Sequence, residues 1–485
     1  MLLTGVHSVL ESGALICIVV APARSRHFYP DAPASRVLWD RVGSMRLNAY
    51  LVKSTVVAAL GGLLFGFDTA VIAGTTRALS ETYHLSPGSL GLTVSIALWG
   101  TIFGAMLAGI PADRYGRRDS LRVLATCYLI SALGCAFAWN WGALVVFRFI
   151  GGVGIGGSSV VGPMYIAEIA PAKWRGRLVG FFQFNVVVGI LLAYFSNYVI
   201  GLEGFGFLEW RWKLGVAAVP AALFLLMLFR IPRSPRWLAK MGRVEEAREV
   251  LRLTGEENFE QELQEIVESV HLERHVEEPL FSWKYRLPIF LAIATGMFNQ
   301  LSGINAVLYY LNDIFARAGF SKVSSDLQAV AIGATNLAAT IIAMSVIDKL
   351  GRKKLLLIGS VGCAASLAGV ASVFLSGRHE NVLVWMLVGF IASFAFSQGA
   401  VIWVYLGEVF PNLVRAKGQS LGSFSHWFMN ALISGIFPVM AESSGAYPFM
   451  FFSAMMVLQF FVVLFVFPET KGVSLEEMQR KLGIA

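Results

Sequence analysis

Asp68 is a carboxylate inside a long apolar stretch, residues 54–74, which carries no other charged residue. On insertion scales, a carboxylate at the centre of a membrane helix costs about 2.5–3.5 kcal/mol, so it needs a partner or a purpose. Asp68 follows Ser54 by 14 residues, which places it about 21 Å along a helix that begins there. The chemistry open to a carboxylate at that depth is the binding and release of a proton.

Arg148 is the basic residue best placed to meet Asp68. It enters a second apolar stretch, residues 143–166, from the opposite end, so the two charges fall at similar depth if both stretches span one bilayer. We expect them to pair. A change in their separation or hydration would then load or release a proton, which is what coupling proton entry to a conformational cycle requires. The alternative is a static structural ion pair.

Acidic and basic residues also recur at matched spacing in two parts of the chain. Residues 113–118 read Asp-Arg-Tyr-Gly-Arg-Arg, and residues 348–353 read Asp-Lys-Leu-Gly-Arg-Lys, an offset of 235. Ion pairs near such helix ends would latch helices together in one state and break in another. The alternative is that they only fix topology.

A second matched set lies further along each part. Glu168 stands seven residues before Arg175, and Glu408 stands seven before Arg415, an offset of 240. We expect these acids to lie within reach of the loop arginines. The expected gating residues are Asp113, Arg117, Glu168, Arg175, Asp348, Arg352, Glu408 and Arg415.

The elements that must position these residues are membrane-spanning helices. The chain has 485 residues, of which 56% are hydrophobic and 14% charged, a composition that suits lipid as the solvent. A helix needs about 20 apolar residues to span the roughly 30 Å hydrocarbon core. Twelve stretches qualify: 54–74, 90–111, 121–139, 143–166, 178–200, 213–232, 288–311, 327–347, 354–376, 382–406, 418–440 and 446–467.

The stretches fall six and six around a polar segment, and the repeated motifs take corresponding places in each group. We therefore predict an all-α membrane protein of twelve transmembrane helices in two six-helix bundles. In the polar segment Val244, Ala247 and Leu251 recur at helical spacing, which predicts short amphipathic helices with apolar stripes facing the membrane domain. The expected division is an atypical extension at 1–44 with Met45 as the natural start, a first bundle at 45–232, a cytoplasmic linker at 233–287, a second bundle at 288–467 and a tail at 468–485.

The net charge of +8 follows from topology and requires no nucleic-acid partner. Thirteen Lys and Arg fall in loops on one side and six on the other, and the richer loops are 112–122, 170–177, 348–354 and 415–417. The positive-inside rule places that side, with both termini, in the cytoplasm. The four cysteines have no paired or metal-like spacing, so we expect no metal or cofactor; they are Cys17, Cys127, Cys135 and Cys363.

Longer motifs carry a family resemblance from residue 53 to residue 482. They are Gly61–Ile72 (GGLLFGFDTAVI), the 113–118 loop, Pro163–Glu168 (PMYIAE), Gln300–Asn305 (QLSGIN), Tyr309-Tyr310 and Pro468–Gly472 (PETKG). In this order the set resembles the sugar porter family of the major facilitator superfamily. The resemblance implies the major facilitator fold, a place in the plasma or inner membrane, and a small-molecule sugar as substrate. It also implies a proton as co-substrate, because facilitative hexose carriers tend to have Asn where Asp68 stands.

The resemblance further implies a sugar site midway across the membrane. Amide side chains donate and accept hydrogen bonds, which suits a ring of hydroxyl groups, and an aromatic face suits the apolar side of a pyranose. One amide in a span more often bonds to another helix, but several suited residues coincide here. The implied substrate-binding residues are Gln183, Asn299, Gln300, Asn305, Asn336, Trp403, His426 and Trp427, with Tyr309 and Tyr310 as gating residues.

Five positions depart from the family pattern, and one of them is Ala400, where the family has a proline. Asn299 and His426 stand where the family often has glutamine or another amide, and Arg233 stands where it has an acid. His426 could titrate, but beside Trp427 we interpret it as a sugar ligand or a packed polar residue. Ile190 stands where similar xylose carriers have glutamine, which favours a pocket of the glucose-handling branch.

We thus expect a monosaccharide transporter that works by alternating access and sugar/proton symport, and not an enzyme. Gly152–Gly157 fits a dinucleotide-binding pattern, but it lies inside an apolar span, where glycines at four-residue spacing allow close helix packing. A facilitative uniporter is the main alternative, which Asp68 disfavours. A sugar sensor that does not transport is more remote, since such receptors usually carry a long signalling tail and here 18 residues follow Phe467.

Overall fold

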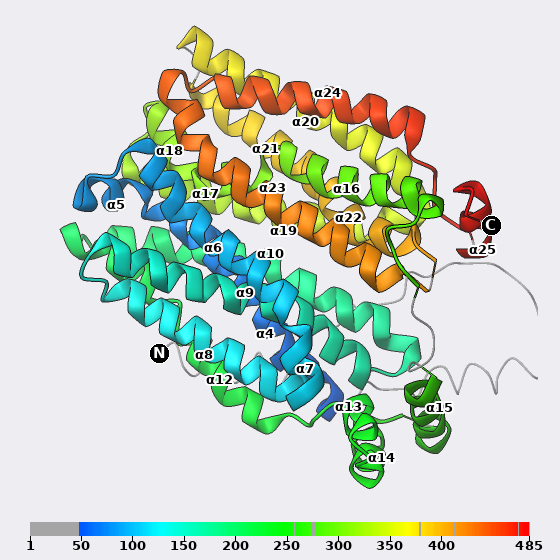
Figure 1. Ribbon diagram of the computed structural model, residues 1–485. Helices are drawn as coiled ribbons and strands as arrows, with labels where there is room; N and C mark the ends of the chain where they lie inside the picture. The colour runs from blue at the N-terminus through cyan, green and yellow to red at the C-terminus, as the bar shows by residue number, and fades with distance from the viewer. Residues whose placement is uncertain are drawn as a thin grey trace, which may run out of the picture.

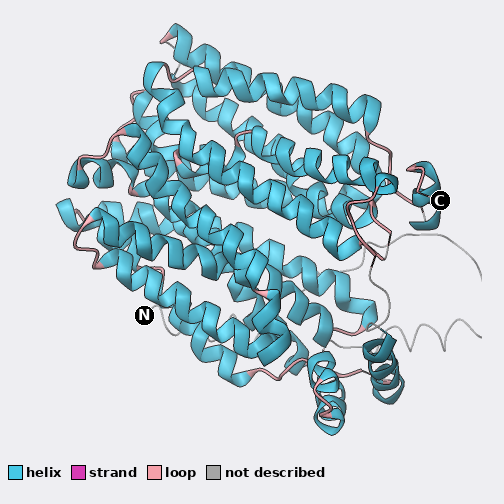
Figure 2. Cartoon of the chain, in the orientation of Figure 1, coloured by secondary structure: helices cyan, strands magenta, loops and turns pink. Residues whose placement is uncertain are grey.

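The computed structural model describes residues 48–256, 258–272, 278–377, 380–411, 413–473 and 475–484. Throughout those ranges the regular secondary structure is helical (Figure 2). Each of the twelve predicted stretches overlaps a helical span long and apolar enough to cross a membrane. The spans are Ala49–Gly74, Pro87–Leu107, Arg117–Ala136, Trp141–Ile169, Lys173–Leu202, Gly206–Arg230, Trp283–Tyr309, Lys322–Ile347, Arg352–Ser376, Val382–Glu408, Arg415–Ser443 and Tyr447–Val466.

Several spans are built from more than one helix (Figure 1). In the first half the helices are α4 (Ala49–Val71), α5 (Thr76–Tyr83), α6 (Pro87–Leu107), α7 (Gly109–Tyr115), α8 (Arg117–Ala136), α9 (Trp141–Ile169), α10 (Ala172–Leu202), α11 (Glu209–Gly215) and α12 (Ala218–Met227). The linker contains α13 (Pro235–Lys240), α14 (Val244–Thr254) and α15 (Phe259–Leu272). In the second half they are α16 (Arg286–Leu301), α17 (Ile304–Tyr309), α18 (Leu311–Arg317), α19 (Lys322–Leu350), α20 (Arg352–Ser376), α21 (Glu380–Phe396), α22 (Gln398–Glu408), α23 (Arg415–Ser443) and α24 (Tyr447–Val466), followed by α25 (Leu475–Lys481).

Polar caps fix where several spans begin. The side chain of Asn48 accepts a hydrogen bond from the Tyr50 N–H at 2.8 Å, and that of Asn140 accepts one from the Ala143 N–H at 2.8 Å. Ser86 caps α6, with a proline next to it at the first helical position. Each cap satisfies a backbone donor that the first helical turn leaves unpaired.

Glycine determines how closely the helices of the first half pack. A Cβ atom added to Gly152 of α9 would lie 1.9 Å from the Ala97 carbonyl oxygen of α6, and one added to Gly156 would lie 2.0 Å from that of Thr101. The two helices therefore touch backbone to backbone. This packing confirms the interpretation of the glycine run as a helix-packing surface.

The halves meet mainly along two helix pairs, α6 with α23 and α10 with α19. Figure 1 shows α6 and α23 side by side. A Cβ added to Gly91 of α6 would lie 1.9 Å from the carbonyl oxygen of Gly435 in α23, so glycine also permits the closest approach across the halves. The two ends of the molecule are marked by α13–α15 and α25 at one end, called inner in line with the predicted orientation, and by α5 and α18 at the outer end (Figure 1).

The seventh span is broken, which the sequence analysis did not predict. Helix α16 ends at Leu301 and α17 begins at Ile304, with Gly303 between them at φ +80°. A Cβ at Gly303 would lie 2.3 Å from the ring of Phe452. Glycine is therefore required there both for its conformation and for space.

The linker helices differ from the expectation in one respect. Their apolar faces meet each other and α13 in a small core of their own, made of Trp237, Leu238, Ala247, Val250, Leu251 and Leu263. Helix α14 also packs against α4 and α9 of the membrane domain. The expected extension at 1–44 and the start at Met45 lie outside the described residues.

Candidate functional site

The break between α16 and α17 gathers the polar residues expected to bind substrate. The Nε2 group of Gln300 lies 3.2 Å from the Oδ1 of Asn299 and 3.2 Å from a ring nitrogen of His426 on α23. Across the break, Asn305 donates from Nδ2 to the Oε1 of Gln300 at 3.1 Å. Three of the four are almost wholly buried, and Asn305 is half-buried. Sequence neighbours and a residue 126 positions away thus form one hydrogen-bonded group.

Aromatic rings border this polar group. The His426 ring packs 5.3 Å from Trp403 of α22 and 4.9 Å from Trp427, centroid to centroid. Phe65 of α4, in the other half, packs 5.4 Å from Trp427. Trp403 is 39% exposed, whereas Trp427 is 4% exposed. Its accessible indole face makes Trp403 the more available stacking surface for a ligand.

Two of the expected substrate residues stand apart from the hydrogen-bonded group. Gln183 lies on α10 and Asn336 on α19, two helices that pack against each other across the halves. Asn336 is buried and Gln183 half-buried. Within the described residues no hydrogen bond joins either amide to Gln300, so the two are not part of the hydrogen-bonded group.

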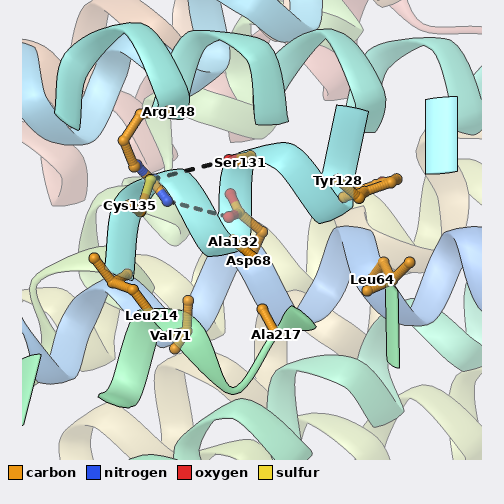
Figure 3. Close-up of a pocket in the computed structure, with 10 residues that line it drawn as sticks. All are labelled: Leu64, Asp68, Val71, Tyr128, Ser131, Ala132, Cys135, Arg148, Leu214 and Ala217. Carbon is orange, nitrogen blue, oxygen red and sulfur yellow. Dashed lines mark hydrogen bonds and ion pairs between the residues drawn. The ribbon is translucent and has the colours of Figure 1, made fainter. Parts of the chain in front are cut away.

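Asp68 and Arg148 form the ion pair predicted from their depth. The Nη1 of Arg148 lies 3.1 Å from the Oδ1 of Asp68, and the two side chains are 4% and 20% exposed. Figure 3 shows the pair at the wall of a cavity of about 20 Å³, which is room for about one water molecule. The Nε–H of Arg148 is buried and has no hydrogen-bond partner in the described part of the chain, so water or a second acceptor at this place would be stabilised.

The sequence analysis missed the other residues that line this cavity. Tyr128, Ser131 and Cys135 come from α8. The Tyr128 hydroxyl lies 2.9 Å from the hydroxyl of Ser158. Their spacing of three and four residues places them on one face of the third span, and this row of small polar groups was the signal available in the sequence.

The outer end is closed around the paired tyrosines. Tyr310 donates from its hydroxyl to the Ser434 carbonyl at 2.9 Å, and Asn430 donates from Nδ2 to the Tyr309 hydroxyl at 3.4 Å. Tyr194 of α10 donates to the carbonyl of Leu308 at 2.8 Å. Because Tyr194 belongs to the first half, this last bond seals the two halves together above the substrate residues.

At the inner end, the first latch joins α7, α8 and α9. Arg117 lies 2.9 Å from the Oε1 of Glu168 and 3.0 Å from the Oδ1 of Asp113. Ser234, at the start of α13, donates to the other oxygen of Glu168. Arg117 and Glu168 are 8% and 10% exposed, so this pair is shielded from solvent on nearly every side.

The second latch repeats that arrangement in the second half. Arg352 lies 2.9 Å from the Oε1 of Glu408, and the Thr470 hydroxyl donates to the Oε2 at 2.6 Å. Glu469 accepts hydrogen bonds from the backbone N–H groups of Arg352 and Lys353 at 2.9 and 3.2 Å. The Pro-Glu-Thr segment after the last span is therefore part of the inner latch.

Arg175 and Arg415 do not pair with the acids seven residues before them. Arg175 lies on α10 beyond the chain turn at Pro171 and contacts Glu262 of α15 at 3.5 Å. Arg415 donates to the Phe410 carbonyl at 3.4 Å. The side chain of Asp348 lies outside the described residues.

Arg233 shows how the chain accommodates a base where the family has an acid. Its Nη2 group lies 3.0 Å from the Oδ2 of Asp119, and its guanidinium lies over the Trp237 ring. Arg118 and Arg122 contact the other oxygen of the same carboxylate. Asp119 therefore supplies the negative charge that the three arginines require.

Comparisons with known proteins agree with this architecture. The family model described as "Sugar (and other) transporter" matches residues 54–482. The D-xylose-proton symporter of Escherichia coli (strain K12) is 36% identical over 470 residues, covering 89% of this chain and 96% of the relative. The arabinose-proton symporter of Bacillus subtilis (strain 168) is 36% identical over 439 residues, covering 89% and 95%.

A solved structure extends the agreement to the fold. It is described as the inward open conformation of the xylose transporter XylE from E. coli, is 35% identical, and aligns with a TM-score of 0.80 over 89% of this chain and 100% of that one. The likeness covers both halves and the helices between them. The chain therefore belongs to the sugar porter family of the major facilitator superfamily, and is a multi-pass membrane transporter, not an enzyme.

Proposed function

We propose that this chain carries a monosaccharide, a hexose or a pentose, in symport with a proton by alternating access. The observation that carries the proposal is the ion pair of Asp68 and Arg148 beside a water-sized cavity within the membrane span. The two relatives described above are named as sugar–proton symporters, which supports the same chemistry. The distribution of basic loops supports a plasma or inner membrane location with both termini in the cytoplasm.

The proposed sugar site lies between the halves, on the residues around the broken seventh span. Gln300, Asn299 and Asn305 offer amide donors and acceptors, and His426 adds a ring nitrogen. Such groups match the alternating donors and acceptors of a sugar's hydroxyls. The substrate residues that complete the site are Gln183, Asn336, Trp403 and Trp427.

Helix α4 provides a physical route from the proton to the sugar. Phe65 and Asp68 lie three residues apart on α4, so they lie on neighbouring positions of one face. Phe65 packs against Trp427 of the sugar site, while Asp68 is bound to Arg148 of α9. Protonation of Asp68 removes its negative charge and weakens its attachment to Arg148. A shift of α4 would then displace Phe65 and change its contact with Trp427.

The inner latches would act in the step of the transport cycle in which the inner end closes. Arg117 with Glu168, and Arg352 with Glu408, each fasten helices within one half. We propose that these latches rearrange when the inner end closes, because closure brings the two inner surfaces together. The network would then exchange partners between the halves.

Uptake into proteoliposomes tests the proposed function. Labelled glucose, galactose and xylose are offered with and without an imposed inward proton gradient. Accumulation above equilibrium that collapses with a protonophore is the expected result. Equilibration without accumulation would instead establish the alternative, a facilitative uniporter, and absence of uptake for all three sugars would reject the proposed substrate class.

The variant Asp68→Asn separates the two activities. We expect it to abolish uphill accumulation while retaining sugar exchange at equal proton concentrations, because the amide keeps the shape but cannot take up a proton. Glu81→Gln is the matched control, since Glu81 is an exposed acid paired with Arg77 on α5. Wild-type accumulation by Asp68→Asn would refute the coupling role.

A further inference from the structure

Four charged residues meet at the outer end, and none of them lines the cavity at Asp68 and Arg148. Glu209 and Lys213 lie on α11 in the first half, and Lys322 and Asp326 lie on α19 in the second. We call them the outer charge cluster. Lys213, Asp326 and Glu209 are 1%, 2% and 4% exposed. Charged side chains are seldom buried to this degree unless they are paired.

Ion pairs cross from one half to the other in this cluster. The Nζ of Lys213 lies 3.3 Å from the Oδ2 of Asp326 and 2.7 Å from the Oε1 of Glu209. Lys322 pairs with the Oε2 of Glu209. Each lysine therefore joins an acid of α11 or α19, and two of the three pairs bridge the halves.

Neighbouring groups complete the cluster. Lys213 also donates to the carbonyl of Gly74 at 3.2 Å, at the outer end of the first span. Asn312 of α18 donates to the other oxygen of Asp326. A Cβ at Gly201 would lie 2.9 Å from the Oδ2 of Asp326, so glycine leaves room for the buried carboxylate. Elements of both halves thus contribute to one site.

The positive and negative charges of the cluster balance, and this balance determines when the cluster holds the two halves together. Two acids and two bases leave no net charge, so burial is tolerated while the pairs remain in contact. If the outer ends of α11 and α19 move apart, the pairs that bridge the halves break and each charge must be hydrated. The pair of Glu209 with Lys213 stays within one helix. The cluster therefore favours contact between the halves at the outer end.

We infer that Glu209, Lys213, Lys322 and Asp326 form an outer gate of ion pairs that holds the carrier closed toward the outside and separates in each transport cycle. The inference rests on the proposed alternating-access cycle. The outer end would then be closed by ion pairs that are separate from those of the inner latches. The inner latches fasten helices of one half, whereas the outer gate fastens one half to the other.

Distance measurements between spin labels test the gate directly. Labels are placed at Thr82 on α5 and Ser443 on α23, two exposed outer positions in different halves. The four native cysteines are replaced by alanine beforehand. In Lys213→Met and in Asp326→Asn, we expect the ratio of long to short distances to rise roughly tenfold or more, because each change leaves a buried charge without its partner across the halves.

The double variant distinguishes direct pairing from general disturbance. Lys213→Met combined with Asp326→Asn removes both members of one pair, so we expect a smaller shift than the two single shifts added together. Additive shifts would overturn the direct pairing. The matched control is Arg77→Gln with Glu81→Gln, which removes an exposed pair within α5 at the same end and should leave the distances unchanged.

A third single variant, at Lys322, tests the outer gate independently of the buried residues. Lys322→Gln removes the one cluster member that is mostly exposed, 61% by its side chain, so it tests the gate even if a variant of buried Lys213 does not fold. Short distances like those of the control in both Lys322→Gln and Asp326→Asn would overturn the gate. The labels report opening whether or not a sugar is carried, so failed uptake rejects the proposed function and unchanged distances reject the gate.

Discussion

Gly303→Ala tests whether the broken seventh span requires glycine. Gly303 adopts φ +80°, and an added Cβ would lie 2.3 Å from the Phe452 ring. The left-handed conformation costs a residue with a Cβ about 1–2 kcal/mol. Forcing a methyl group into a packed site costs a further ~1–3 kcal/mol. We therefore expect a loss of about 2–5 kcal/mol in the free energy of unfolding.

The matched control for this change is Gly377→Ala. Gly377 follows α20 with φ +59°, but among the described residues no atom beyond its own helix and chain neighbours lies within 4 Å of the place its Cβ would take. Its cost should be the conformational part alone, about 1–2 kcal/mol. Unfolding of both variants is followed by titration with sodium dodecyl sulfate in mixed micelles.

The clash at Phe452 also predicts a functional difference. Asn305 bonds to Gln300 across the break at 3.1 Å, so a displaced Gly303 moves the two amides relative to each other. Sugar binding should weaken in Gly303→Ala and remain unchanged in Gly377→Ala. If the two variants lose equal stability, the contact with Phe452 does not constrain the break, and the reasoning is refuted.

Three other changes test separate parts of the molecule. Gln300→Ala should weaken sugar binding about tenfold, because buried polar neighbours lose a partner; an unchanged dissociation constant by calorimetry would remove Gln300 from the site. Arg117→Gln should lower the free energy of unfolding by about 3–5 kcal/mol in the same micelle titration, because Glu168 is left buried without its cation. Arg114 is exposed, so Arg114→Gln should lower it by less than about 1 kcal/mol. Burial raises the pKa of Asp313, in α18, from 3.8 to about 6, so this carboxyl should make the free energy of unfolding fall as pH rises through that range. Asp313→Asn should therefore reduce the pH dependence measured in the micelle titration, and a pH dependence equal to that of the wild type would contradict the assignment.

Features that depend on one segment at a time were predictable from the sequence. The apolar stretches gave the twelve spans because a fixed membrane thickness sets their length. Asp68 and Arg148 could be matched because depth along two spans is countable from either end, and they lie 3.1 Å apart. The hydrophobic spacing around Ala247 likewise predicted α14.

Apart from that ion pair, the following features that depend on which segments meet were not predictable. Glu168 was expected within reach of the loop arginines, but the spacing did not say which one it would bind; it binds Arg117, 51 positions away. Asp326 and Lys213 are 113 positions apart and belong to different halves. The lack of space for a side chain at Gly303 comes from the Phe452 ring of another helix. In each case the deciding contact comes from tertiary packing between distant residues, and the order of residues along the chain does not show which of them meet.

The approach of Gly91 to Gly435 bears on how well a proton gradient is kept. Backbone meets backbone at this place, where an added Cβ would lie 1.9 Å from the opposing oxygen. A continuous file of water, which protons could follow, has no room between surfaces in such contact. A carrier driven by a gradient loses efficiency with every ion that passes without cargo. In the proposed symporter we therefore expect these two glycines to limit proton leak along this contact between the halves.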